Sequence, residues 1–226
     1  MSARSPPPLK AAINQPIDGT AENGAEPRAM PLRYTSRMTQ SPALELEGRS
    51  IYDGQRMSVE QYLALPEEKP YLEYVDGVVI QKAMPNKKHM ILAGELIFEF
   101  VLYSREHGGT CGPEGRTRLA TERFRLPDVA YWALAKPLED GKLLLPPTLA
   151  VEIRSPDETR RHQRDKCRMY REHGVEVCWL FDPEARTVER FEGDADAEPV
   201  TGVLQSSHLP GFSLALAELW SRLDDR

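Results

Sequence analysis

A short apolar strand that contains a glutamate, LAVEI at residues 149–153, limits what this chain can fold into. Its three aliphatic residues alternate with Ala150 and Glu152, and successive side chains of a strand point to opposite faces. Arg154 follows on the face of Glu152. Either the strand is partly exposed and carries an ion pair on its outer face, or Glu152 serves a site that also needs a second acid nearby.

The residues after this strand predict a strand–helix–strand unit. Residues 157–174 have a helical pattern that ends at Gly174, and VEVCWLFDP at residues 175–183 is a strongly apolar strand. We expect a right-handed crossover that leaves the two strands parallel. The segment TVERFEG, residues 187–193, is then expected to pair back on the second strand.

The elements before and after this unit predict an α/β layer with a mixed sheet. A capping box at Ser58 predicts a short helix, and Asp76 with Gly77 predicts the turn of a β-hairpin. The remaining expected elements are a long amphipathic helix within 87–109, single strands within 108–120 and 123–134, and a turn with a closing helix within 209–220.

Composition and charge narrow the classes of function. The 226 residues carry a formal net charge of −6, so contact with nucleic acid would need a local basic patch rather than bulk charge. Three cysteines without a C-x-x-C spacing disfavour structural zinc and a disulfide framework. The sequence shows no membrane-spanning run and no secretory signal pattern, so we expect a cytoplasmic protein. Residues 1–45 lack periodicity and predict a disordered tail before a domain at 46–226.

A second acid stands within residues 123–132, where Asp128 follows Pro127 at the start of a strand. Taken alone, it is as readily a turn residue as a functional one. With Glu152 on a neighbouring strand it makes a pair of carboxylates, which repel each other unless a cation lies between them. Mg²⁺ suits such a pair because it prefers hard oxygen ligands. Glu73, in the first hairpin strand, either completes the site or is a solvated edge residue.

The helix within 157–174 has two stripes of side chains, one expected to pack on the sheet and one basic. The first stripe holds Gln163, Lys166, Cys167 and Tyr170, and the second holds Arg160, Arg164, Arg168 and Arg171. The arginines form either a solvated face or a patch that follows phosphates. Lys166 either extends its ammonium to solvent or points at something anionic near Glu152. His89, near the start of the long helix, is either a phosphate contact or a structural residue.

These residues resemble a known superfamily. LPDVAYW followed by LAVEIRSP resembles the P-D…(D/E)-x-K signature of restriction-endonuclease-like phosphodiesterases. More closely, segments covering roughly residues 57–220 resemble, in order, the bacterial Uma-two family of restriction-endonuclease-like proteins. The segments are MSVEQYLALPEE, YLEYVDGVV, LPDVAYW, LAVEIRSPDE, RDKCRMYREHGVEVCWLFDPEARTVERF and LPGFSLALAELW.

The resemblance implies a restriction-endonuclease-like core, in which helices flank a mixed central β-sheet. It implies that Asp128, Glu152 and the main-chain carbonyl of Ile153 bind Mg²⁺, with Mn²⁺ as a substitute. Glu73 matches an upstream acid of the family that holds the metal directly or through water.

The chain departs from the signature at Arg154, where the superfamily has lysine. Arginine stays charged and is a poor proton shuttle. Lys166, on the adjacent helix, matches a position to which that lysine can migrate. The departure puts the catalytic base in doubt and leaves the expected metal site unchanged.

Taken together, these expectations describe a metal-dependent endonuclease that hydrolyses phosphodiester bonds, with DNA as the preferred substrate. Lys166, or second to it Arg154, would orient the attacking water or offset charge on the phosphate. The alternative is a catalytically inactive nuclease-like module that binds DNA or a protein. Nothing in the sequence separates DNA from RNA, and a homodimer is expected from the resemblance alone.

Overall fold

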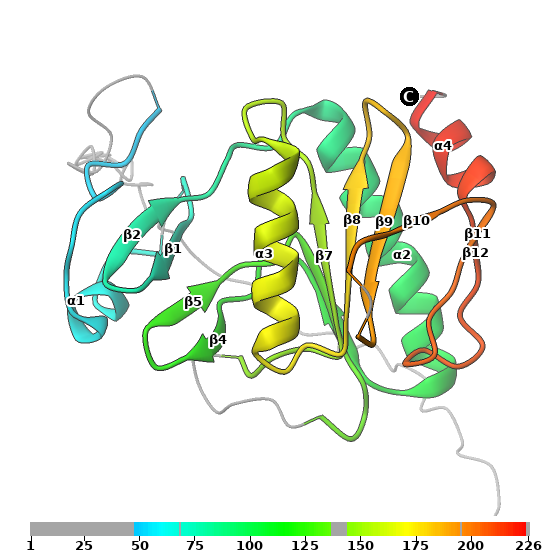
Figure 1. Ribbon diagram of the computed structural model, residues 1–226, viewed down its shortest axis with the longest axis horizontal. Helices are drawn as coiled ribbons and strands as arrows, with labels where there is room; N and C mark the ends of the chain where they lie inside the picture. Colours follow the sequence, from blue (N-terminus) through cyan, green and yellow to red (C-terminus); the bar gives the residue numbers. More distant parts are fainter. Residues whose placement is uncertain (1–47, 68, 137–143, 195, 225–226) are drawn as a thin grey trace, which may run out of the picture. The chain divides into compact units, whose positions relative to one another are not determined.

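The computed structural model describes residues 48–67, 69–136, 144–194 and 196–224. The expected tail at residues 1–45 therefore lies outside the described residues. The helices are α1 Val59–Leu63, α2 Lys87–His107, α3 Arg160–Glu172 and α4 Leu216–Asp224 (Figure 1). The strands are β1 Leu72–Val75, β2 Val78–Gln81, β3 Thr110–Gly112, β4 Thr117–Ala120, β5 Arg123–Arg125, β6 Val129–Trp132, β7 Leu149–Ile153, β8 Val177–Asp182, β9 Thr187–Glu192, β10 Glu198–Val200, β11 Val203–Leu204 and β12 Leu214–Ala215.

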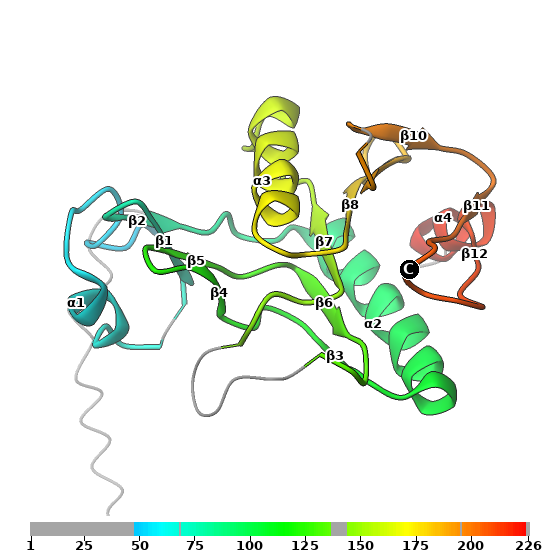
Figure 2. The same ribbon diagram turned by 60° about the horizontal axis from the view of Figure 1, so that its bottom comes forward.

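The described strands form a large mixed sheet and a smaller antiparallel one. The large sheet has the order β10-β9-β8-β7-β6-β3, and its parallel pair is β7–β8, as the strand–helix–strand pattern predicts. The smaller sheet has the order β2-β1-β5-β4, and β11 pairs separately with β12. The chain passes from β5 of the smaller sheet to β6 of the large one through residues 126–128 (Figure 2). Asp128 therefore lies where the two sheets are joined.

Local sequence signals account for several boundaries. The Ser58 hydroxyl accepts a hydrogen bond from the Gln61 main-chain N–H, and the Gln61 side chain accepts one from the Ser58 main-chain N–H, which confirms the capping box. Asp76 and Gly77 have φ of 51° and 85°, the left-handed conformation that a tight hairpin turn requires. α2 ends at Gly108, as its sequence predicts.

The single strands expected within 108–120 and 123–134 are each divided in two. A turn at residues 113–116 separates β3 from β4, and Glu114 there has a φ of 50°. Pro127 separates β5 from β6 because it has no N–H to donate to a ladder. These breaks allow the halves of each segment to join different sheets.

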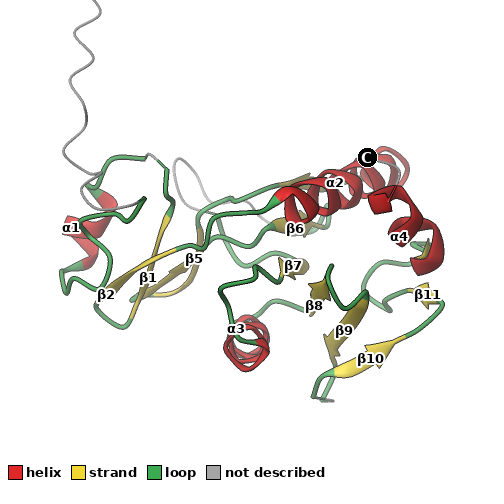
Figure 3. Ribbon diagram, turned by 90° about the horizontal axis from the view of Figure 1, so that it is seen from above, coloured by secondary structure: helices red, strands yellow, loops and turns green. Residues whose placement is uncertain are grey.

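Helices cover both faces of the large sheet, with α3 on one and α2 and α4 on the other (Figure 3). Every residue of β7 is buried, which excludes the first of the two alternatives, a partly exposed strand. Val151 and Ile153 pack in the core that includes α2 and α4, whereas Ala150 packs against Cys167 and Tyr170 of α3. The alternation along β7 thus turns Glu152 toward α3. None of the described helices has an apolar stretch long enough to cross a bilayer.

Gly109 tests how tightly the end of α2 packs on β6. Its φ is +90°, and an added Cβ would stand 2.4 Å from the Trp132 carbonyl oxygen. We expect Gly109→Ala to lower the free energy of unfolding by roughly 3 kcal/mol, through strain and collision with backbone. Gly112→Ala is the matched control, because no atom lies within 4 Å of its added Cβ. Urea denaturation measures both, and equal stability of the two variants would contradict this account.

Candidate active site

Three buried acids meet beside α3, and they come from both sheets. Glu73 lies in β1 of the smaller sheet, Asp128 lies just before β6, and Glu152 lies in β7. Their exposed fractions are 2, 4 and 2%. The register pairs Val129 with Val151, and one further step sets Asp128 opposite Glu152 on adjacent strands. The structure thus brings together the acids that the sequence singled out.

Lys166 of α3 places its ammonium between two of these acids. Its Nζ donates to Glu152 Oε2 at 2.9 Å and lies 3.2 Å from Glu73 Oε1. The hydroxyl of Tyr170, one helical turn further, donates to Glu152 Oε1 at 2.8 Å. Lys166 is 5% exposed, so its ammonium points at the acids rather than out to solvent.

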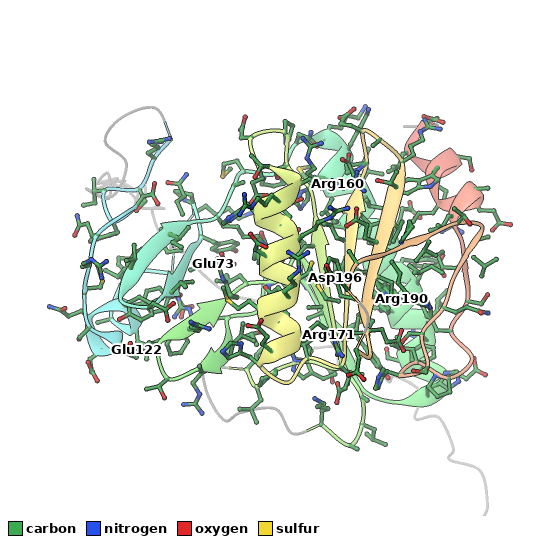
Figure 4. All side chains as sticks on the ribbon, in the orientation of Figure 1. Glu73, Glu122, Arg160, Arg171, Arg190 and Asp196 are labelled. Atoms are coloured by element: carbon green, nitrogen blue, oxygen red, sulfur yellow. The ribbon has the colours of Figure 1, made fainter. Side chains whose placement is uncertain are left out.

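Glu73 is fully engaged by groups of the protein. Arg125 Nη1 donates to its Oε2 at 2.5 Å, and the Leu126 amide donates to its Oε1 at 3.0 Å. Figure 4 shows Glu73 on the side of the small sheet that lies toward α3. With Lys166 on its remaining side, Glu73 connects β1, β5 and α3.

One carboxylate oxygen of Asp128 accepts a hydrogen bond, and the other lies near a lysine and a histidine without accepting an aligned one. The Ile153 amide donates to Oδ2 at 2.6 Å. Oδ1 lies 2.8 Å from Lys82 Nζ and 3.2 Å from His89 Nε2, yet it accepts no aligned hydrogen bond from any described residue. His89 in turn lies with Nδ1 3.4 Å from Ser155 Oγ. His89 is thus buried against Asp128 instead of facing solvent.

The three carboxyls titrate differently because their neighbours differ. Burial would raise the pKa of Glu73, but the charges of Lys166 and Arg125 lower it to about 2. Burial would also raise the pKa of Asp128, and Lys82 and His89 hold it below its usual range. For Glu152, burial and the charge of Asp128 outweigh Lys166 and raise the pKa to about 7. The acids raise the pKa of Lys166 against the effect of burial, so its ammonium stays protonated.

A cleft of about 720 Å³ reaches Glu73 and Lys166 of this cluster, and Asp128 and Glu152 lie behind its lining residues. Glu73, Lys82 and Lys166 line it from the inside. Its other lining residues include Arg49, Asp53, Asp157, Thr159 and His162. Two buried ammonium groups that face one cleft offer a place where a phosphate can bind.

The arginine stripe of α3 is paired within the protein. Arg160 and Arg164 both donate to the buried carboxylate of Glu189, and Arg168 binds Asp196 at 2.9 Å. Arg171 donates to main-chain carbonyls beyond the helix. Figure 4 shows Arg160 and Arg171 at opposite ends of α3 and Asp196 beside it.

Arg154, at the signature position, is turned away from the acid cluster. Its Nη1 donates to Asp182 at the end of β8 at 2.9 Å, and its Nε donates to the Glu158 carbonyl at 3.3 Å. Lys166 is therefore the cation next to Glu152, and Arg154 connects β7 to β8.

The carboxylate oxygens of this cluster are suitable ligands for a hard divalent cation, although the ammonium groups of Lys82 and Lys166 lie beside them. Asp128 and Glu152 offer carboxylate oxygens from adjacent strands, and Asp128 Oδ1 is buried without an aligned donor among the described residues. Within that same part of the chain, no three His, Cys, Asp or Glu side chains gather closely enough to hold a metal ion. A metal here would take two carboxylates and complete its shell with main-chain oxygen and water.

Sequence reasoning missed Lys82 and Arg125. The hairpin register pairs Glu73 with Ile80, so Lys82, two residues later, lies on the face of Glu73. The sequence could have predicted this, because a two-residue Asp76–Gly77 turn fixes the register of the hairpin. Arg125 reaches Glu73 through the pairing of β1 with β5, about 50 residues apart, for which the sequence has no local signal.

Glu73→Gln tests the charge balance of the cluster. Because the pKa of Glu73 falls from 4.5 to about 2 on folding, its carboxylate stabilises the fold above pH 4.5 and loses this effect as pH falls toward 2. We expect the variant to lose on the order of 3 kcal/mol of unfolding free energy at pH 7 and less below pH 4. Urea denaturation across pH measures this, with the exposed Glu67→Gln as control. An unchanged pH profile would contradict it.

Comparison with known proteins identifies the family of this chain and a protein of similar fold. The family model Uma2, described as "Putative restriction endonuclease", matches residues 59–222. The chain is also similar to the crystal structure of a putative nuclease of DUF820 from Anabaena variabilis ATCC 29413, with 25% identity and a TM-score of 0.67. That match covers 74% of this chain and 99% of the other. No protein with a curated description matches. The chain belongs to the Uma2 family of restriction-endonuclease-like proteins.

Proposed function

We propose that this protein is a metal-dependent endonuclease that hydrolyses phosphodiester bonds in DNA. The observation that supports it is the pair of buried carboxylates on adjacent strands, with the Lys166 ammonium 2.9 Å from one of them. Burying two carboxylates is costly even beside lysines, and a site for a divalent cation and a phosphate substrate gives them a function.

Asp128, Glu152 and the main-chain carbonyl of Ile153 would hold the metal, Mg²⁺ or in its place Mn²⁺. Bound there, such an ion supplies a polarised phosphoryl oxygen and a water of lowered pKa. Glu73 has its oxygens taken by Arg125, the Leu126 amide and Lys166, which favours a role through water or through Lys166 over direct binding.

Lys166 would act as a fixed positive charge. Its raised pKa keeps the ammonium protonated, so it offsets negative charge on the phosphate instead of removing a proton from water. Lys82 lines the same cleft and adds a second ammonium near the phosphate position. Arg154 is paired with Asp182 and stands second to Lys166 in this role.

Nucleic acid would reach the cleft past the basic side of α3. Arg160, Arg164 and Arg168 have side chains that are 46, 39 and 40% exposed, so they can contact phosphates while paired with their acids. His89 is buried on Asp128, which favours a role in orienting that carboxylate over a phosphate contact. The protein would act in the cytoplasm, where DNA is accessible.

Nicking of supercoiled plasmid in Mg²⁺, Mn²⁺ or EDTA tests the proposal. We expect metal-dependent nicking that falls at least about 100-fold in Asp128→Asn and Glu152→Gln, because each removes a charged metal ligand. Lys166→Met should lower the rate without abolishing metal binding. Glu192→Gln is the matched control, a largely buried acid on β9 away from the cleft. Nicking that persists in EDTA or in both acid variants would contradict the proposal.

The second candidate is a nuclease-like module without catalysis, which the occupation of both carboxylates by lysines favours. Metal binding separates the two. Since the pKa of Glu152 is raised to about 7, a metal must displace a proton below that pH. Calorimetry should therefore show Mg²⁺ affinity about fivefold weaker at pH 6 than at pH 7. No metal binding at pH 8 by a folded protein would favour the inactive module.

A further inference from the structure

A second pocket, of about 200 Å³, is built around the start of the smaller sheet. Tyr62 of α1 and Tyr71, which precedes β1, contribute aromatic rings to its wall. Leu65 and Leu126 add apolar surface. Sites for drug-sized ligands are larger, about 300–1,000 Å³, so this pocket suits a single planar ring system.

Three charged side chains also line this pocket, those of Glu67, Glu114 and Arg116. The guanidinium of Arg116 lies over the ring of Tyr62, with its Cζ 5.2 Å from the ring centre. Its Nε is buried and has no hydrogen-bond partner among the described residues. Its Nη1 lies 3.4 Å from Glu67 Oε1, a long contact to a side chain that is 58% exposed. Arg116 therefore offers N–H donors that a bound ligand can use.

Glu114 connects the pocket to the acid cluster. It has a φ of 50°, a conformation that is uncommon outside glycine, and its N–H donates to the Pro127 carbonyl at 3.1 Å. Its Oε1 lies 3.6 Å from Lys82 Nζ, which in turn lies 2.8 Å from Asp128 Oδ1. A small recess shares Tyr71 and Glu114 with the pocket and Lys82 with the cleft. The pocket thus adjoins the place where a phosphate would bind.

We infer that this pocket binds one unpaired guanine of the DNA strand, next to the phosphate that is cut. The identity of the ligand as DNA rests on the proposed function. Guanine has two acceptors, O6 and N7, on one edge, and an arginine such as Arg116 can bind both. Its N1–H and N2 amino group are adjacent donors, which suit a carboxylate such as Glu114. No other DNA base combines these two edges.

A base can enter this pocket only after it has left the base stack. Tyr71 would then stack on it, as aromatic side chains do in sites for single strands. Lys69 is exposed, with its ammonium 5.2 Å from the centre of the Tyr71 ring, and would bind the adjoining phosphate. An unpaired base enters such a pocket at lower cost than a paired one. We therefore expect single-stranded DNA to bind better than duplex.

Fluorescence anisotropy of labelled oligonucleotides in EDTA tests the inference without hydrolysis. The strands are a run of thymines and the same run with one central guanine, adenine or cytosine. We expect the guanine strand to bind roughly tenfold more tightly than the other strands and than its own duplex. Hypoxanthine or 7-deazaguanine in place of guanine, which lack the N2 amino group and N7, should lose most of this preference. Equal affinity for all strands, or no binding, overturns the inference.

Variants of the protein separate base reading from stacking. Arg116→Met keeps an unbranched side chain over Tyr62 and removes the donors, so the preference for guanine should fall at least about fivefold. Tyr71→Ala should weaken all strands alike, because stacking does not depend on the base. Arg186→Met is the matched control, since that arginine pairs with Asp224. A guanine preference that survives Arg116→Met in a folded protein overturns the inference.

The plasmid assay distinguishes failure of this inference from failure of the proposed function. A protein that nicks plasmid but binds all strands equally keeps the nuclease function and loses the guanine pocket. A protein that prefers guanine but does not nick plasmid keeps the guanine pocket and loses the nuclease function.

Discussion

The ion pairs of Lys166 with Glu73 and Glu152 are the interaction on which the arrangement of the two sheets and the acid cluster most depends. The Lys166 ammonium is buried between a glutamate of the small sheet and a glutamate of the large one. Removing one partner of such a cluster leaves a charge without compensation inside the protein, which costs several kcal/mol. Ion pairs thus connect the two sheets, in addition to the chain segment at residues 126–128.

The same cluster explains why the acids can lie at this depth. Each carboxylate has a different set of neighbours: an arginine and an amide for Glu73, a tyrosine and a lysine for Glu152, and an amide with a nearby lysine and histidine for Asp128. Glu152 is the least compensated, and its pKa is raised accordingly. Glu152, the carboxyl whose ionisation is least favourable, is thus also a proposed metal ligand.

Local patterns predicted much of this structure. The alternation along β7 gave the face of Glu152, and helical periodicity separated Lys166 from the arginines of α3. What could not be predicted depends on pairing between distant segments. Arg125 meets Glu73 only because β1 pairs with β5, for which the sequence has no local signal. The pairing of β9 with β8 was predicted, but the contact of Glu189 with the α3 arginines across it was not. The sequence showed Pro127, but it did not show that the strands before and after this proline belong to two different sheets.

The placement of the cleft at the junction of the two sheets has a consequence for motion. Glu73 and Lys82 belong to the hairpin side, whereas Asp128 and Glu152 belong to the large sheet and its edge. A small rotation of the smaller sheet relative to the large one would therefore separate the acids and lysines of the cluster while leaving both sheets folded. A ligand that contacts both sides of the cleft would hold them together. Its binding would slow hydrogen exchange throughout the hairpin, including at amides that the ligand does not touch.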